Sequence, residues 1–80
     1  MQPRSENLIR LKPGHSAVIS QLIHIDPMLR RRLADLGIHE GASITVKRYC
    51  LWGGPVLLEC RGQLLSIRRR EAARIEVSGS

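Results

Sequence analysis

The clearest periodic pattern in the chain is helical and lies between residues 26 and 37. Three leucines fall at i, i+4 and i+7, which places them on one face of a helix: Leu29, Leu33 and Leu36. Asp26 can cap the first turn and Pro27 suits the first helical position, where its missing N–H removes no hydrogen bond. Gly37 suits the residue that ends a helix. The pattern therefore predicts one short amphipathic helix.

The residues that follow alternate between apolar and polar with the period of a β-strand. One face of the first predicted strand carries Ala42, Ile44 and Val46, and the other carries Ser43, Thr45, Lys47 and Tyr49. The next strand, residues 56–61, is predicted to turn Val56, Leu58 and Cys60 inward and Leu57, Glu59 and Arg61 outward. A hairpin loop at residues 50–55 joins the two strands. This hairpin would place Lys47 opposite Glu59 as a favourable cross-strand pair.

Shorter apolar segments predict four more strands, at residues 8–11, 16–23, 64–67 and 74–77. Pro13-Gly14 and Gly62-Gln63 supply turns between them, and residues 68–73 predict a single helical turn. Five or six short strands with one inserted helix indicate a mainly β fold, a small barrel that leaves no open sheet edge. We expect one domain over residues 8–77, with flexible ends at residues 1–7 and 78–80.

Composition limits the core and the location of the protein. The chain has 80 residues, 42% of them hydrophobic, which allows one small domain. Tyr49 and Trp52 are the only aromatic residues, so the core must be aliphatic. No apolar run is long enough to cross a bilayer and no signal peptide is recognisable, so we expect a cytoplasmic protein with reduced Cys50 and Cys60.

The charge is strongly positive. Thirteen Lys and Arg against seven Asp and Glu give a formal net charge of +6, with arginine triplets at residues 30–32 and 68–70. Such a field favours an acidic partner, namely nucleic acid, an anionic membrane face or an acidic protein surface. A nucleic-acid-binding barrel would use both triplets. It usually also stacks bases on several aromatic side chains, so we favour the interpretation that the triplets are solvated faces.

No residue pattern predicts catalysis or a strong metal site. The serines and threonines lack a His or Asp at a suggestive spacing, and Gly53-Gly54 leads into a strand rather than a phosphate-binding helix. The cysteines and histidines lack metal-ligand spacing. We therefore expect no enzyme activity and no required cofactor. His24, His39 and Cys50 remain weak candidates for binding Fe(II) or Zn(II).

The loop at residues 50–55 is the most informative feature. Leu51 and Trp52 are large apolar residues beside two glycines, and Tyr49 and Leu57 are predicted to face outward on the adjoining strands. Exposed apolar surface with aromatic residues is typical of a protein interface. The alternative is that the loop folds back and Trp52 caps one end of the barrel. The pattern leaves both possibilities open.

Residues 29–41, LRRRLADLGIHEG, resemble the L-R-R-R-L-x-D-L-G-[LI]-x-x-G signature of the FeoA family, whose members accompany the bacterial ferrous iron transporter FeoB. Further similarity lies in LKPG at 11–14, GGP at 53–55 and LSIRRREA at 65–72. The resemblance implies an SH3-like barrel with an inserted helix, in a small cytoplasmic protein that supports Fe(II) uptake by docking on the cytoplasmic domain of FeoB. Similar domains are attached to metal-responsive repressors.

One departure from the family concerns the hairpin loop. That loop commonly reads A-P-L-G-D-P, whereas CLWGGP here lacks the first proline and the acidic residue. The leading hypothesis is a non-enzymatic interaction module that binds the transporter domain or a second copy of itself, and meets a membrane only through that partner. Its expected partner-binding residues are Tyr49, Leu51, Trp52, Leu57, Arg30, Arg31 and Arg69.

Overall fold

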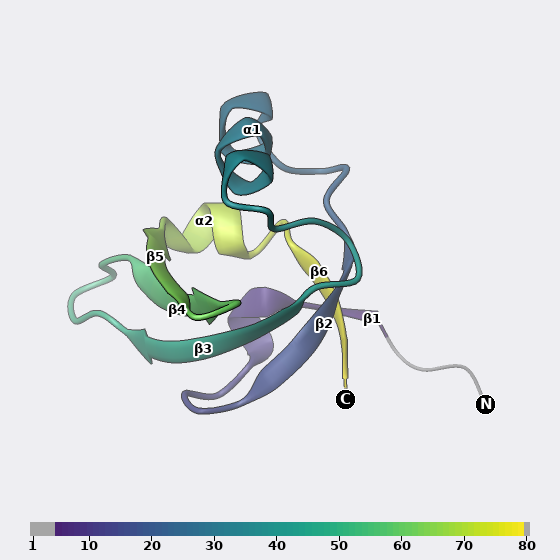
Figure 1. Cartoon of the computed structure of the whole chain (residues 1–80). Coiled ribbons are helices and arrows are strands. Elements are labelled where there is room, and N and C mark those ends of the chain that lie inside the picture. Colours follow the sequence, from purple (N-terminus) through teal and green to yellow (C-terminus); the bar gives the residue numbers. More distant parts are fainter. Residues whose placement is uncertain (1–4, 80) are drawn as a thin grey trace.

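The computed structural model describes residues 5–79 and shows six strands in one antiparallel sheet, bent into a small barrel (Figure 1). The strand order is β1-β6-β2-β3-β4-β5. The strands are β1 (Ser5–Asn7), β2 (Ser16–Gln21), β3 (Ser43–Tyr49), β4 (Val56–Cys60), β5 (Gln63–Ile67) and β6 (Glu76–Gly79). The mainly β class with one inserted helix is confirmed.

The two ends of the described chain pair with each other in the sheet. β1 pairs with β6, with Ser5 opposite Ser78, and β6 also pairs with β2. The expectation of flexible ends is therefore wrong for residues 5–7 and 78–79, because their backbone groups are used in strand pairing. Residues 1–4 and 80 lie outside the described residues.

The expectation of a sheet without open edges is also wrong for this part of the chain. β1 and β5 are the outer strands of the described sheet and do not pair with each other. Helix α1 (Pro27–Asp35) lies near the β5 edge, where the Arg32 guanidinium donates to the carbonyl of Ser66 over 3.4 Å. One edge is thus covered by a side chain rather than closed by a neighbouring strand.

Helix α1 begins and ends as the sequence predicts. The Asp26 carboxylate accepts the N–H of Met28 over 3.2 Å, and Pro27 occupies the first turn. At the other end Gly37 adopts a φ of +76°, and the N–H of Ile38 reaches the carbonyl of Leu33 over 2.8 Å. Local signals at both termini explain why this element could be recognised from sequence. No helix within residues 5–79 is long and apolar enough to span a bilayer.

The segment after β1 differs from its prediction. Residues 8–11 were predicted as a strand, but Leu8–Arg10 forms a 3-10 helix, η1. The N–H of Leu8 donates to the carbonyl of Ile75 over 2.9 Å, and the N–H of Leu11 turns back to Leu8. Leu8 is fully buried. One tight turn is enough to place this single leucine in the core, so residues 8–10 need no partner strand.

The core is aliphatic, as the composition predicts. Its largest fully buried side chains come from every part of the chain: Leu8, Ile19, Leu33, Ile38, Ile44, Leu58 and Ile75. Among the described residues no charged or polar residue is buried. The short helix α2 (Arg69–Ala72) adds Ala72 to this core and lies between β5 and β6 in the chain. The core therefore provides packing, and chemistry must be sought at the surface.

A bulge in β3 changes the direction of its last residues. The β3–β4 register shifts between Val46 and Arg48, and Tyr49 then lies opposite the buried Val56. An extra residue reverses the alternation, so Tyr49 turns toward the core instead of outward. In the observed register Thr45, not Lys47, lies opposite Glu59. The predicted ion pair still forms, with 3.7 Å between Lys47 Nζ and Glu59 Oε1.

Candidate interaction site at the hairpin tip

The tip, defined as residues 50–55 between β3 and β4, projects from one end of the molecule (Figure 1). Its two large apolar side chains are in solvent: Leu51 is 80% exposed and Trp52 is 98% exposed. The alternative in which Trp52 folds back to cap the barrel is therefore wrong. An exposed indole beside an exposed leucine is rare at a surface that contacts only water.

The turn at the tip holds Trp52 in an unfavourable backbone conformation. Trp52 has a φ of +61° and Gly53 a φ of +72°, and the N–H of Gly54 donates to the carbonyl of Leu51 over 3.1 Å. Turns with positive φ at both central positions favour Asn-Gly or Gly-Gly. A tryptophan there costs about 1–2 kcal/mol of backbone strain. Strain kept at a fully exposed side chain points to a function for that side chain.

Arg69 holds the tip from helix α2. Its Nε donates to the carbonyl of Gly54 over 2.9 Å, and its Nη2 donates to the carbonyl of Cys50 over 2.8 Å. The guanidinium also lies over the Tyr49 ring, 5.3 Å from the centroid. Arg69 was expected to bind a partner directly. The structure uses its guanidinium internally, so Arg69 positions the tip.

Tyr49 supports the base of the tip instead of forming an exposed contact. Its hydroxyl lies 3.0 Å from the carbonyl oxygen of Ile9 and 2.5 Å from that of Leu11, and it donates its proton to these acceptors. Burial raises the pKa of the Tyr49 hydroxyl, and the Arg69 charge opposes part of that rise. The ring packs against the core. The prediction that Tyr49 faces outward is therefore wrong.

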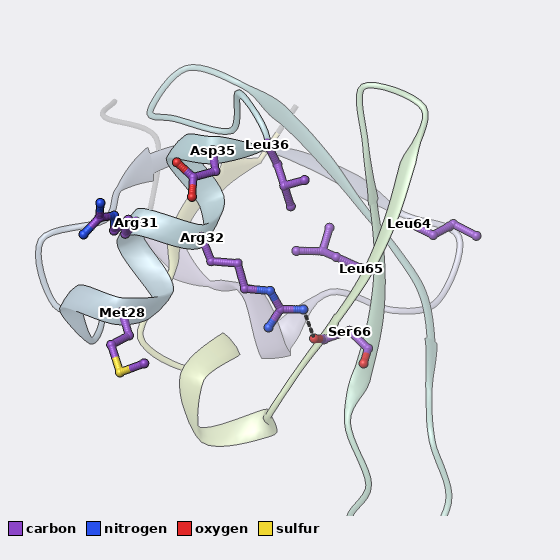
Figure 2. Close-up of a pocket in the computed structure, with 8 residues that line it drawn as sticks. All are labelled: Met28, Arg31, Arg32, Asp35, Leu36, Leu64, Leu65 and Ser66. Atoms are coloured by element: carbon purple, nitrogen blue, oxygen red, sulfur yellow. Dashed lines mark hydrogen bonds between the residues drawn. The ribbon is translucent and has the colours of Figure 1, made fainter.

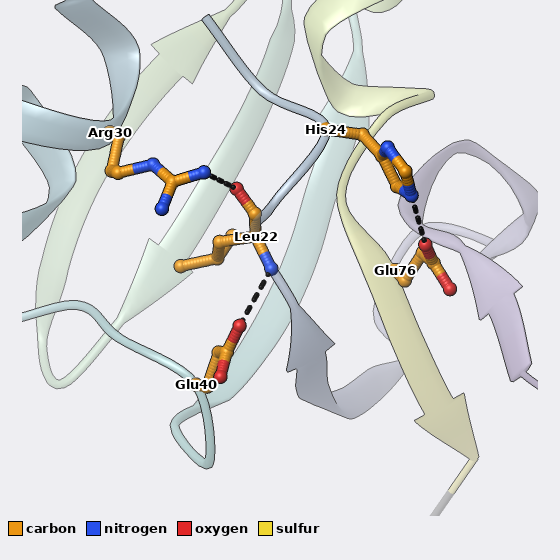
Figure 3. Close-up of polar contacts among 5 residues, drawn as sticks. All are labelled: Leu22, His24, Arg30, Glu40 and Glu76. Carbon is orange, nitrogen blue, oxygen red and sulfur yellow. Dashed lines mark hydrogen bonds and ion pairs between the residues drawn. The ribbon is translucent and has the colours of Figure 1, made fainter. Parts of the chain in front are cut away.

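The other expected partner-binding residues do not join the tip. Leu57 is half-buried and lies opposite Arg48 on the outer side of the hairpin. Arg30 donates from Nη2 to the carbonyl of Leu22 over 2.8 Å, which ties α1 to the segment after β2 (Figure 3). Arg31 stays exposed on α1. The predicted patch thus separates into an exposed tip, an internal support and a separate helix face.

Arg31 belongs to a second surface feature, an open groove of about 710 Å³ between α1 and β5 (Figure 2). Its lining residues are Met28, Arg31, Arg32, Asp35, Leu36, Leu64, Leu65 and Ser66. Leu65 points toward the helix, whereas Leu64 points away from it (Figure 2). This groove was not predicted from the sequence, because it forms only where α1 crosses the β5 edge.

Comparison with known proteins connects this architecture to one family. The model of the FeoA domain matches residues 6–79. The chain belongs to the FeoA family. A solution structure of the FeoA protein from Chlorobium tepidum is 40% identical, with a TM-score of 0.83, and the match covers 90% of this chain and 68% of that one. Iron(II) transport protein A from Clostridium thermocellum is 30% identical, with a TM-score of 0.79, over 91% of this chain and 44% of that one.

Two further results complete the comparison. A manganese-dependent transcriptional repressor shares the fold at 18% identity, with a TM-score of 0.83, over all of this chain and 44% of that one. No curated protein matches the chain. The FeoA family is one of small domains associated with iron uptake, and its fold here is the SH3-like barrel that the resemblance to this family implied.

The FeoA signature residues of this chain carry structural contacts. Arg30 donates a hydrogen bond to the carbonyl of Leu22, and the Glu40 carboxylate accepts the N–H of Leu22 over 3.0 Å (Figure 3). Gln63 donates to the carbonyl of Leu36 over 2.9 Å at the end of α1. These contacts fix the inserted helix against the sheet. No local signal reveals them, because Glu40 lies 18 positions from Leu22.

The weak metal candidates are not brought together in the FeoA fold. His24 Nε2 lies 3.4 Å from Glu76 Oε2, and His39 Nδ1 lies 3.1 Å from the carbonyl oxygen of Glu40 (Figure 3 shows the His24 pair). Cys50 is half-buried at the start of the tip. Within residues 5–79, no group of three or more His, Cys, Asp or Glu side chains could hold a metal ion.

Proposed function

We propose that this chain is a small cytoplasmic accessory protein of bacterial ferrous iron uptake. In this proposal it is a non-enzymatic module that docks on the cytoplasmic domain of a FeoB-type transporter and modulates transport. Membership in the FeoA family supports a role in ferrous iron uptake. The strongly positive net charge of the chain supports an acidic protein partner. Contact with the membrane arises through the transporter.

The observation that carries this proposal is the exposed, strained and internally supported tip. Leu51 and Trp52 offer apolar contact area, and Arg69 holds the carbonyls of Cys50 and Gly54 on either side of them before any partner arrives. A loop with a preorganised backbone loses less conformational entropy on binding. Leu51 and Trp52 are thus the proposed contact residues, with Tyr49 and Arg69 as their support.

Capture of the transporter from membranes of iron-limited cells tests the proposal. Replacing both tip residues (Leu51→Ser with Trp52→Ser) should lower the amount of FeoB-type transporter recovered by at least about tenfold, as expected for two central interface residues. The thermal midpoint should stay nearly unchanged, because both side chains lie in solvent. Ile23→Ser, at another exposed apolar residue, is the matched control and should leave capture unchanged.

Two results would refute this role for the tip. A large fall in the thermal midpoint of the double variant would show that Leu51 and Trp52 stabilise the fold. Full recovery of the transporter by a folded double variant would move the docking surface elsewhere, with the groove beside Arg31 the next surface to test.

Nucleic-acid binding is the alternative function, and the contacts make it less favourable. Tyr49 is engaged with backbone carbonyls, which leaves Trp52 as the one exposed aromatic among the described residues. Arg30, Arg32 and Arg69 each donate to a backbone carbonyl, so the two arginine triplets are not fully free for phosphates. Single-strand binding usually needs several stacking platforms.

A further inference from the structure

We propose that the tip is a rigid apolar plug that enters a preformed apolar pocket with carboxylates at its rim. This inference rests on the proposed function and adds the chemistry of the partner surface. The plug consists of Leu51 and Trp52, and the rim charges are met by Arg48 and Arg68.

The tip has the properties of a plug because its backbone is fixed on both sides. The turn is closed by the bond from Gly54 N–H to the Leu51 carbonyl, and the chain at its base is closed by the 2.9 Å bond from Cys50 N–H to Pro55 O. Arg69 then holds two carbonyls of the same loop. A Cβ on Gly54 would meet the Cys50 Cβ and the Leu51 carbonyl oxygen at 3.0 Å, so the loop is also tightly packed.

The charge around the plug determines the chemistry of the rim. Between residues 41 and 70 the chain has six Lys and Arg residues and a single acidic residue, Glu59. Glu59 is paired with Lys47. With six cations and one anion, residues 41–70 have a net charge of +5, which is most of the formal net charge of +6. A partner surface that contacts this segment needs carboxylates to be complementary.

Arg48 and Arg68 are the cations placed to meet that rim. Arg48 precedes Tyr49 at the end of β3, and Arg68 follows Ile67, which pairs with Val56 at the base of the tip. Both side chains are exposed, and neither forms an ion pair with another described residue. Arg48 lies near the end of β3 and Arg68 is the N-cap of α2, so the two cations flank the tip from two different elements.

A protein pocket fits these observations better than a lipid surface or a nucleic acid. A fluid lipid interface accepts tryptophan in many orientations, so it does not require a strained and fixed turn. Nucleic acid requires more stacking residues than one. Only a pocket of defined shape makes use of a turn whose backbone conformation is fixed before binding.

The single tryptophan provides a direct test. Growth with 5-fluorotryptophan gives the full chain one fluorine label, at Trp52, because the sequence has no other tryptophan. Unlabelled full-length FeoB-type transporter in zwitterionic lipid nanodiscs is then added, and the ¹⁹F resonance is followed. We expect the resonance to move from its free position and to become protected from a soluble paramagnetic quencher.

Charge reversal tests the rim. Arg48→Glu with Arg68→Glu should weaken transporter binding by about tenfold or more, since like charges would then face each other across the interface. Raising the salt concentration should weaken wild-type binding more than binding of this variant. Arg61→Glu is the matched control, because Arg61 lies in the turn at the opposite end of β4. It should change affinity less than twofold.

The outcomes separate this inference from the proposed function. A chain that binds the transporter while the Trp52 resonance stays at its free position overturns the plug alone. The same shift produced by empty anionic nanodiscs, or by an RNA oligonucleotide, also overturns it and assigns the tip to lipid or nucleic acid. Absence of any binding to the transporter overturns the proposed function, and the plug loses its partner with it.

Discussion

At the scale of single residues, Trp52 combines two features that ordinary surface positions do not share. Its side chain is almost completely exposed, and its backbone has a φ of +61°. Arg61 is the other non-glycine residue with positive φ among the described residues, at +54°, and it also precedes a glycine in a hairpin turn. Two turns of the same kind therefore carry one apolar and one charged residue at equivalent positions.

Replacing Trp52 by Asn should stabilise the fold and weaken binding together. Asn tolerates positive φ, and Asn-Gly is preferred in such turns, so the free energy of unfolding should rise by about 0.5–1 kcal/mol. Loss of the indole should lower affinity for the partner. Chemical denaturation measures the first effect and transporter capture the second.

Arg61→Asn is the matched control for that substitution. It relieves the same backbone strain in the β4–β5 turn, so it should stabilise the fold by a similar amount without changing partner binding. If Trp52→Asn lowered stability instead, the indole would be packing against the protein in solution, and the exposed plug would be refuted.

At the scale of elements, helix α2 acts on the tip through one side chain. The four residues of α2 lie after β5, yet Arg69 reaches the carbonyls at both ends of the β3–β4 loop. A planar guanidinium can serve two acceptors at once, which a lysine ammonium does with less geometric precision. The conformation of the tip is thus set by an element distant in sequence.

Arg69→Lys should therefore loosen the tip while keeping the charge. We expect faster hydrogen exchange at the N–H groups of Cys50 and Gly54, weaker transporter binding, and a loss of about 1–2 kcal/mol of stability from the missing charged hydrogen bonds. Arg70→Lys is the control, because Arg70 is exposed beside it. Unchanged hydrogen-exchange rates in the Arg69 variant would show that the backbone hydrogen bonds of the loop are enough to keep its conformation.

Elements with local signals could be predicted from the sequence. Helix α1 has its cap, its proline and its terminal glycine within one short segment, and the inward faces of β3 and β4 follow from alternation as far as the bulge. The resemblance to the FeoA family added the barrel type. These predictions needed only residues that are near each other in the chain.

Features set by distant segments could not be predicted. The bulge at Val46–Arg48 reverses the direction of the Tyr49 side chain, and no residue pattern predicts this bulge. The 3-10 turn at Leu8 depends on Ile75, and the support of the tip depends on Arg69. Trp52 could have packed or projected, since an apolar residue in a loop is compatible with both.

At the scale of the whole molecule, the position of β6 determines whether the sheet can exist. β6 lies between β1 and β2 and pairs with both. It also places the fully buried Val77 in the core. Its loss would leave β1 without a partner, leave one edge of β2 unpaired and open the core to water.

Removal of residues 76–80 should accordingly unfold the domain. The truncated chain should lose its cooperative thermal transition and the slow-exchanging N–H groups of β2, because both backbone pairing and core packing are lost. Circular dichroism and hydrogen exchange measure these effects. A truncated chain that still melts cooperatively would show that β2 to β5 form an independent unit.

The inner position of β6 also affects how the chain folds during synthesis. Residues 76–79 follow all the other strands in the chain, yet they must enter between two strands that are already made. The sheet therefore cannot be completed until this segment has emerged from the ribosome. Until then the nascent chain presents the unpaired edge of β2 and an incomplete core, which is the condition in which small β domains need protection from aggregation.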